Sequence, residues 1–122
     1  MSWNKDVALS HLRSRALGHS HHECATFTRE AIEAGGIRLE RTRNAKDYEP
    51  SLLRAGFREV PSGSVLRSGD VAVIQPYPGG SASGHMTMYD GTQWISDFRQ
   101  SSMYPGPGYR ASHPAYKIYR MN

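Results

Sequence analysis

Apolar residues recur at helical spacing through the first half of the chain. A stripe near the N-terminus consists of Ala8, Leu9, Leu12 and Ala16, and a second consists of Phe27, Ala31, Ile32 and Ala34. We expect the second helix to begin near Cys24, with Ser20 as a candidate N-cap upstream, and to end at residues 35–36. Gly18 is a typical stop for the first helix, and a third, shorter helix is predicted over about 47–55.

The second half alternates between short apolar runs and turn residues. The run 71–74 follows a Gly-Asp turn and predicts a buried strand. Segments 85–89 and 93–98 flank Asp90-Gly91 and predict a hairpin. A loop rich in Pro and Gly is expected over 101–114, followed by a last strand over 115–120. Helices first and strands afterwards predict an α+β fold, with N-terminal helices packed on a C-terminal antiparallel sheet.

The register of the expected hairpin bears on the chemistry. A three-residue loop pairs Met88 with Trp94 and places both methionines of the first strand on one face with Trp94 and Phe98. A two-residue loop would mix the two faces, so the apolar pattern favours the three-residue loop. In the favoured register Asp97 lies directly opposite His85.

Composition indicates a soluble globular protein with a single domain over residues 1–122. Of the 122 residues, 38% are hydrophobic and 21% are charged. No apolar run approaches the roughly 18 residues of a membrane helix. The N-terminus lacks the continuous apolar segment of a secretory signal. We therefore expect synthesis in the cytoplasm and no membrane insertion.

The chain is basic, with a formal net charge of +4 and a pI of about 9.5. Such a balance indicates either a solvated basic surface or attraction to an anionic partner, such as nucleic acid or a bacterial cell wall. The charges are scattered, and the sequence has neither an RNA-binding aromatic motif nor zinc-finger spacing. We expect no nucleic-acid partner, no cofactor and no metal.

Cys24 is the single cysteine, so the thiol is either a small buried hydrophobe or a reactive group. It precedes the apolar stripe of the second helix, where the helix dipole and free N–H groups favour a thiolate. The same N–H groups suit the oxyanion of a tetrahedral intermediate. Its neighbours His21, His22 and Glu23 are polar or titratable, which speaks against an inert core thiol.

His85 opens a strand after a flexible loop, and this position makes it the candidate general base. In the favoured register Asp97 accepts the imidazole N–H and fixes the tautomer of the ring. Aspartate is also common near strand ends and turns, so a structural role for Asp97 stays open.

A histidine cluster offers a different interpretation. His19, His21 and His22 lie close to Cys24 in the sequence, and imidazole and thiolate groups can coordinate zinc or copper. Their spacing matches no compact structural metal site well. A metal-binding module is therefore kept as an alternative to thiol chemistry.

Two stretches resemble a known family. The segment ECATFTREAIEAGG resembles the nucleophile helix of the CHAP and NlpC-like cell-wall peptidases and amidases, which have a papain-like fold. The segment SGDVAVIQPYPGGSASGHMTMYDGTQWISDF resembles their strand, loop and histidine hairpin. Asp97 occupies the place of the residue that orients the histidine. The resemblance covers roughly residues 20–98, and Glu23 departs from the Asp or Gln of many relatives.

The resemblance implies a cysteine hydrolase with Cys24 as nucleophile and His85 as base. Its substrate would be a peptide bond in a peptidoglycan stem peptide or cross-link. The loops 76–84 and 101–114 would border the groove, with candidate substrate contacts at Tyr104, Tyr109 and Arg110. Papain-like thiol sites also perform acyl transfer and deamidation, and the residues alone leave these reactions open, together with a non-catalytic binding module.

A compact basic member is similar to the amidase effectors of the bacterial type VI secretion system, and equally to phage-encoded or bacteriocin-type lysins. Similarity to the effectors implies an antibacterial role and delivery to the periplasm or cell wall of a target bacterium. It also implies a cognate immunity protein as partner.

Overall fold

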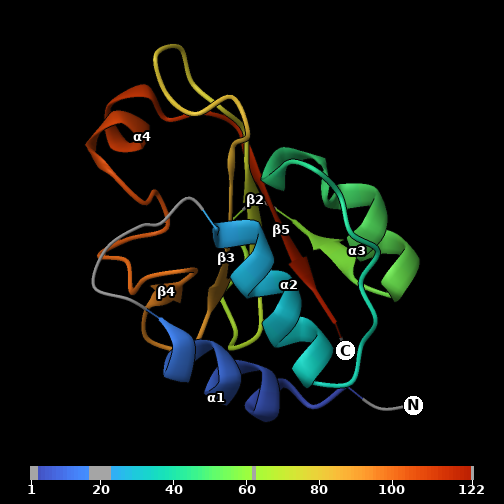
Figure 1. Cartoon of the computed structure of the whole chain (residues 1–122). Coiled ribbons are helices and arrows are strands. Elements are labelled where there is room, and N and C mark those ends of the chain that lie inside the picture. The colour runs from blue at the N-terminus through green and yellow to red at the C-terminus, as the bar shows by residue number, and fades with distance from the viewer. Residues whose placement is uncertain (1–2, 17–22, 62, 122) are drawn as a thin grey trace.

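The computed structural model describes residues 3–16, 23–61 and 63–121. Its elements in chain order are α1 (Lys5–Arg15), α2 (Cys24–Ala34), the 3-10 helix η1 (Ala45–Asp47), α3 (Glu49–Ala55), β1 (Arg58–Val60), β2 (Val71–Ile74), β3 (His85–Tyr89), β4 (Trp94–Ile95), α4 (Pro107–Ser112) and β5 (Tyr116–Arg120). The strands form one antiparallel sheet in the order β1-β5-β2-β3-β4. The expected α+β architecture is confirmed, with helices packed on an antiparallel sheet (Figure 1).

Local sequence accounts for the two long helices. The Asn4 side chain caps α1 by accepting a hydrogen bond from the N–H of Val7 at 3.1 Å. Most residues of the two predicted apolar stripes face the interior, and the buried residues are Ala8, Leu9 and Leu12 in α1 and Phe27, Thr28, Ala31 and Ile32 in α2. Ala16 is half-buried, and Ala34, at the end of the second stripe, is exposed. At the end of α2, the Gly35 N–H donates hydrogen bonds to carbonyl oxygens of the last turn. The candidate stop Gly18 and cap Ser20 lie outside the described residues.

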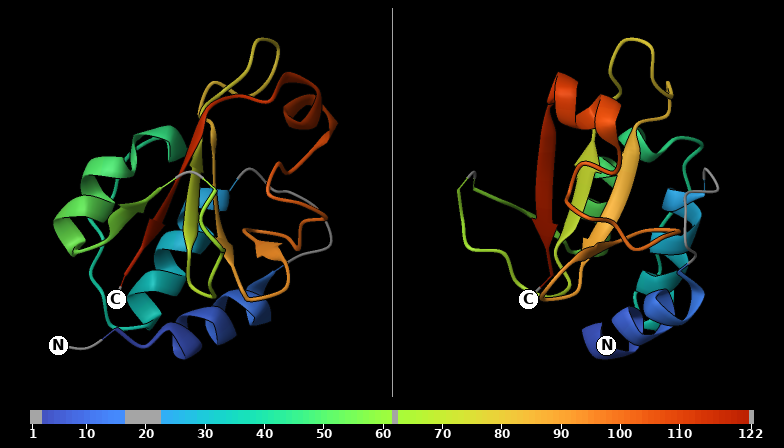
Figure 2. Two further views of the ribbon diagram at one scale, coloured as in Figure 1. Left: turned by 180° about the vertical axis from the view of Figure 1, so that it is seen from behind. Right: turned by 90° about the vertical axis from the view of Figure 1, so that its left-hand side faces the viewer.

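The two faces of the sheet carry cores of unequal size. The larger core lies between the sheet and helices α1, α2 and α3, and includes Leu12, Ile32, Leu52, Met86 and Tyr119. Figure 2 shows α1 and α2 on one side of the sheet and α4 at its end. The smaller core lies on the other face and consists of Ala72, Ile74, Trp94 and Tyr109.

Most predicted elements are present. The helix that begins at Cys24, the buried strand β2, the strand β3 and the last strand are all confirmed. The third helix spans Glu49–Ala55 and ends, as expected, at Gly56. Gly56 has φ +110°, a left-handed conformation that a residue without Cβ adopts readily.

The predicted hairpin register is wrong. Tyr89 pairs with Trp94 and Met88 with Ile95, so the loop holds four residues rather than three. The Asp90 side chain builds this longer loop, because its Oδ1 accepts hydrogen bonds from the backbone N–H groups of Thr92 and Gln93 at 2.9 and 2.8 Å. As a result Ile95, rather than Trp94, joins the two methionines in the larger core.

Three further differences lie in the second half of the chain. The second strand of the hairpin ends at Ile95, and the chain then turns back so that the Ser96 N–H donates to the Phe98 carbonyl at 3.0 Å. The predicted loop 101–114 contains the helix α4, which Pro107 starts and His113 ends. The short strand β1 has no apolar pattern that the sequence could reveal, since its first two residues are exposed.

Candidate active site

Cys24 is the first residue of α2, as the sequence predicts. The apolar stripe that follows it anchors the helix on the sheet, and the thiol packs half-buried at the edge of the larger core. The backbone N–H groups of Met86, Ala25 and Cys24 itself favour the thiolate and act to lower the pKa of the thiol. The first N–H groups of a helix have no partner inside the helix, so they remain available to a bound anion.

His85 is the first residue of β3 and is 6% exposed. It pairs with Ile74 of β2, so the imidazole lies on the face of the smaller core, tilted toward the ring of Tyr109 at 6.1 Å between centroids. Gly84 allows the backbone before His85 to pass close to β2. Its φ is +73°, and a Cβ there would lie 2.4 Å from the Ile74 carbonyl oxygen. Only glycine fits this left-handed, crowded position.

Asp97 is fully buried, beyond the end of β4. Its Oδ2 accepts a hydrogen bond from the backbone N–H of Glu23 at 3.1 Å, and its Oδ1 accepts one from the Ser96 hydroxyl at 3.2 Å. The carboxylate therefore holds the residue that precedes Cys24. The wrong register removes the argument that placed Asp97 opposite His85, yet the turn after β4 brings the carboxylate close enough to act electrostatically on both Cys24 and His85.

Gln100 is a residue of this site that sequence reasoning missed. It is 3% exposed, and its Oε1 lies 2.8 Å from Nε2 of His85. Its side-chain amide donates to the carbonyls of Ser102 and Met103, both at 2.9 Å. Gln100 lies in irregular chain after β4, where no periodicity or motif distinguishes one polar residue from another.

Cys24 and His85 line the same cavity, which has a volume of about 360 Å³. The remaining lining residues are Tyr77, Ser81, Ser83, Gly84, Phe98, Pro105, Gly106, Pro107, Gly108 and Tyr109. Two loops supply most of this lining, the one before β3 and the one that leads into α4. Among the described residues no hydrogen bond joins the thiol to the imidazole, and catalytic contacts often tighten only when substrate binds.

The three residues predicted to contact substrate occupy different positions. Tyr109 lines the cavity, and its ring packs edge-on against Tyr77 at 4.8 Å. Tyr104 and Arg110 are not among the described residues that line it. The Tyr104 hydroxyl donates to the Pro114 carbonyl at 2.7 Å, and Arg110 donates to the Tyr104 carbonyl at 3.4 Å. Both of these hydrogen bonds tie the loop around α4 to itself.

Burial sets the protonation states of the pair. Desolvation raises the pKa of Cys24 to about 11, and the negative charge of Asp97 adds to this effect, while the backbone N–H groups oppose it. Desolvation also lowers the pKa of His85, against the hydrogen bond to Gln100 and the charge of Asp97. The helix N-terminus acts in the expected direction, but burial outweighs it. At neutral pH the cavity therefore holds a neutral thiol and a neutral imidazole.

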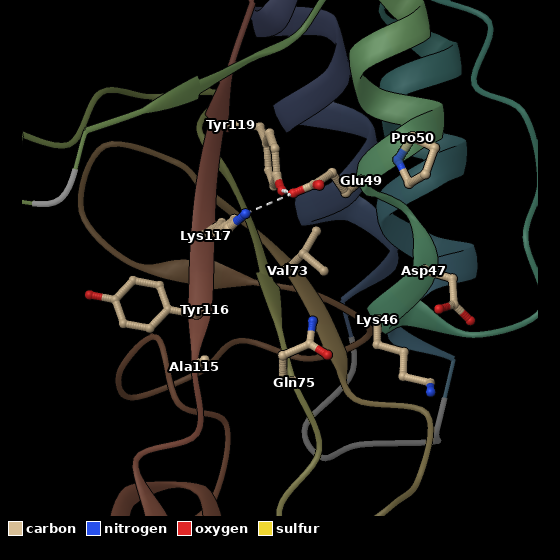
Figure 3. A pocket seen from close by; sticks show the side chains of 10 residues that line it. All are labelled: Lys46, Asp47, Glu49, Pro50, Val73, Gln75, Ala115, Tyr116, Lys117 and Tyr119. Carbon is tan, nitrogen blue, oxygen red and sulfur yellow. Dashed lines mark hydrogen bonds and ion pairs between the residues drawn. The ribbon is translucent and has the colours of Figure 1, made fainter.

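Figure 3 shows a second, larger hollow between the segment η1–α3 and strands β2 and β5. In it Glu49 accepts a hydrogen bond from the Tyr119 hydroxyl and pairs with Lys117 at 3.5 Å. Its lining contains neither a thiol nor an imidazole. Size therefore does not identify the reactive site, and the cavity with Cys24 and His85 is the candidate.

The histidine cluster His19, His21 and His22 lies outside the described residues. Within the described ranges, no group of three or more His, Cys, Asp or Glu side chains is arranged to hold a metal ion. A search of the same ranges found no helix with the length and apolar character needed to cross a membrane.

No protein-family model matches the chain, and a comparison with curated proteins found no match. Solved structures do match. A chain of the native type VI effector-immunity complex Tae3-Tai3 from Ralstonia pickettii is 50% identical, with a TM-score of 0.93, over 98% of this chain and 100% of that chain. A chain of the selenomethionine form of the complex is 54% identical, with a TM-score of 0.85, over 93% and 98%. At this identity and coverage, the chain belongs to the Tae3 family of type VI secretion effectors.

Proposed function

We propose that this protein is a cysteine amidase that cleaves a peptide bond in peptidoglycan stem peptides or their cross-links. The observation that carries the proposal is one cavity lined by both the thiol at the start of α2 and the imidazole at the start of β3. A nucleophile and a base in one cleft are the minimum that acyl transfer requires. Membership of an effector family supports a bacterial target outside the producing cell.

The first half of the reaction forms a thioester. His85 takes the proton from the Cys24 thiol as the sulfur attacks the carbonyl carbon of the scissile bond. The carbonyl oxygen becomes an oxyanion, which the backbone N–H of Cys24 at the helix N-terminus stabilises. The C–N bond then breaks, and the proton held by His85 passes to the departing amine nitrogen.

The second half returns the enzyme to its starting state. Water gives a proton to His85 and attacks the thioester carbon, and the C–S bond breaks. The products are the carboxylic acid of the cleaved peptide and the Cys24 thiol, which recovers its proton from His85. Because the free enzyme holds a neutral thiol and a neutral imidazole, proton transfer accompanies the attack rather than preceding it.

Asp97 acts as the electrostatic partner of this proton transfer. Its buried negative charge favours the imidazolium that His85 becomes when it takes the proton. Its hydrogen bond to the Glu23 N–H fixes the backbone that leads into the nucleophile. Both roles fit a third catalytic residue, although neither requires direct contact with the imidazole.

The partners follow from the family. The matching chains come from effector-immunity complexes, so we propose that a cognate immunity protein binds this effector. Coverage of the cavity that holds Cys24 and His85 would protect the producing cell and its siblings. We propose delivery by a type VI secretion system into a target bacterium, where the substrate lies in the periplasm.

The test is digestion of purified peptidoglycan sacculi, with products identified by mass spectrometry. Wild type should release new fragments whose masses name the cleaved bond, whereas Cys24→Ala and His85→Ala should release none. The variant His113→Asn is the matched control, since it removes an exposed histidine at φ +49°, a conformation that asparagine tolerates. Equal activity of Cys24→Ala and wild type would rule out the thiol mechanism.

Two other reactions give different products in the same assay. A deamidase would raise the mass of an intact peptide by about one unit, the difference between an amide and an acid. An acyltransferase would join the acyl fragment to an added amine. Metal retained in stoichiometric amount by the purified protein would favour the histidine-cluster alternative.

A further inference from the structure

The hydrogen-bond network around Gln100 defines the orientation of its side-chain amide. One end of the amide lies 2.9 Å from two backbone carbonyl oxygens, those of Ser102 and Met103. A carbonyl oxygen only accepts hydrogen bonds, so the NH₂ group must be at this end. The amide oxygen is therefore left to face His85, 2.8 Å from Nε2. The backbone of Gln100 is also fixed, because its N–H donates to the Trp94 carbonyl at 2.9 Å.

This orientation has a consequence for the imidazole. An amide oxygen accepts, so Nε2 of His85 must carry a proton to make the contact. A neutral imidazole has one protonated nitrogen, which leaves Nδ1 with the free lone pair. Nδ1 is then the one ring atom that can take a proton from a neighbouring thiol.

We propose that Gln100 is the positioning residue for His85: it holds the imidazole as the Nε2–H tautomer and so makes Nδ1 the general base. This inference rests on the proposed thiol mechanism for its consequence in catalysis, while the tautomer itself does not depend on the substrate. Gln100 takes over the role that the sequence assigned to Asp97. The carboxylate instead supports the reaction through its charge and through its contact with the backbone before Cys24.

The choice of an amide rather than a carboxylate at this position is consistent with the surroundings. A glutamate here would direct a charged oxygen at the carbonyls of Ser102 and Met103, which cannot donate a hydrogen bond to it. It would also place a second negative charge beside His85 and favour the imidazolium, which cannot act as a base. A neutral acceptor fixes the ring and leaves it unprotonated at Nδ1.

The first test reads the tautomer directly, by nitrogen-15 NMR of the histidine rings in the intact protein. We expect wild type to show His85 protonated on Nε2, with a proton protected from exchange by its hydrogen bond. Gln100→Met, which keeps the volume and removes the acceptor, should speed exchange of that proton at least tenfold. A wild-type ring protonated on Nδ1, or unchanged exchange in a folded Gln100→Met, would overturn the proposal.

The second test reads catalysis against a control. Gln100→Met should lower kcat on peptidoglycan about 100-fold with little change in KM, the cost of a catalytic group misplaced by about 1 Å. Gln93→Met is the matched control: it replaces a half-buried glutamine in the loop at the far end of β3 and should leave kcat unchanged. An equal loss of kcat in both variants would indicate a general structural effect and refute a specific role for Gln100.

The third test uses Gln100→Glu, which keeps an oxygen near Nε2 and adds a charge. We expect NMR titration to show a pKa of His85 at least one unit higher than in wild type, and the acid limb of the kcat/KM profile to move with it. An unmoved pKa would show that residue 100 does not touch the ring. If the NMR results are as expected but wild type digests no peptidoglycan, the proposed function fails and the tautomer assignment stands.

Discussion

The two faces of the sheet support the candidate site in different ways. On the face covered by α1, α2 and α3, a large apolar core holds the helices, and Cys24 packs at its edge. On the other face a small core is supplemented by polar contacts within the chain after β4, such as those of Gln100 with Ser102 and Met103. The comparison shows that regular packing positions Cys24, whereas an irregular, hydrogen-bonded segment positions His85.

This difference has a physical basis. An apolar stripe buries itself wherever a matching surface exists, and it tolerates small changes in local geometry. A hydrogen bond to a buried ring requires a specific distance and direction, and a lost partner leaves a buried polar group unsatisfied. We therefore expect substitutions on the helical face to affect stability first and substitutions around His85 to affect catalysis first.

The largest expected effect on stability is on the helical face. Ile32 is fully buried in the larger core, so Ile32→Ala should lower the free energy of unfolding by about 2–5 kcal/mol through lost burial and a cavity. Urea unfolding measures the loss, and kcat per folded molecule should stay near wild type. Val7→Ala, at an exposed position on α1, should cost no more than about 0.5 kcal/mol. Equal losses would mean that the helices do not depend on this core.

Gly84→Ala, unlike Ile32→Ala, should lower activity as well as stability. The new Cβ would lie 2.4 Å from the Ile74 carbonyl oxygen at a φ of +73°, so the backbone beside His85 must shift. We expect a stability cost of about 1–3 kcal/mol from the strained backbone alone, and a loss of kcat beyond the unfolded fraction.

Gly79 provides the control for this substitution. It also has a positive φ, +90°, but nothing lies within 4 Å of a Cβ built there. Gly79→Ala should therefore cost about 1–2 kcal/mol from its conformation, with kcat unchanged. If Gly79→Ala lowers kcat as much as Gly84→Ala, the close approach at Gly84 has no special part in placing His85.

Asp97→Asn should lower activity with a smaller change in stability, since an asparagine oxygen can still accept from the Glu23 N–H. Loss of the negative charge should lower the pKa of His85 and lower the pKa of Cys24, because the charge raises both. We expect kcat to fall about tenfold for each pKa unit by which the imidazolium is destabilised, because it loses its electrostatic partner. NMR titration of His85 and alkylation of Cys24 against pH measure the two shifts, and a rise in either would contradict this role.

The pH profile of wild type follows from the same directions. In the proposed mechanism His85 acts as a base when neutral, so kcat/KM should fall as the pH drops through its pKa, which lies below the ordinary 6.5. The activity should therefore persist below pH 6.5 and fall about tenfold per pH unit at still lower pH. Alkylation of Cys24 in the free enzyme should rise steadily up to about pH 11. If the rate of alkylation reached half its maximum near pH 8, the thiol would be more exposed to solvent than it is in the structure.

The smallest expected effect is at the surface of the helical face. Arg15 of α1 pairs with Glu30 of α2, and both side chains are partly exposed. Glu30→Gln should lower the free energy of unfolding by no more than about 1 kcal/mol, less at high salt, and leave kcat unchanged. A loss comparable to that of Ile32→Ala would show that charge pairing, rather than the apolar core, joins the two helices.

Much of the fold could be predicted because its signals are local. The stripes of α1 and α2, the Gly56 stop and the apolar run of β2 each depend on spacing within one segment. The register between β3 and β4 could not be predicted, because the Asp90 side chain builds a loop one residue longer than the apolar pattern favours. Helix α4 could not be predicted either, because it lies in a segment whose Pro and Gly content is typical of loops.

By itself, the sequence determined where the two reactive groups stand in the chain: a thiol at a helix start and an imidazole at a strand start. These positions follow from the apolar periodicity and from the glycines that end helices and start turns. Both are local signals that extend over a few residues. Only the tertiary structure decided that Gln100 bonds His85, that Asp97 holds Glu23, and that burial keeps the thiol and imidazole neutral. Those outcomes depend on contacts between segments far apart in sequence, where one residue of register changes every partner.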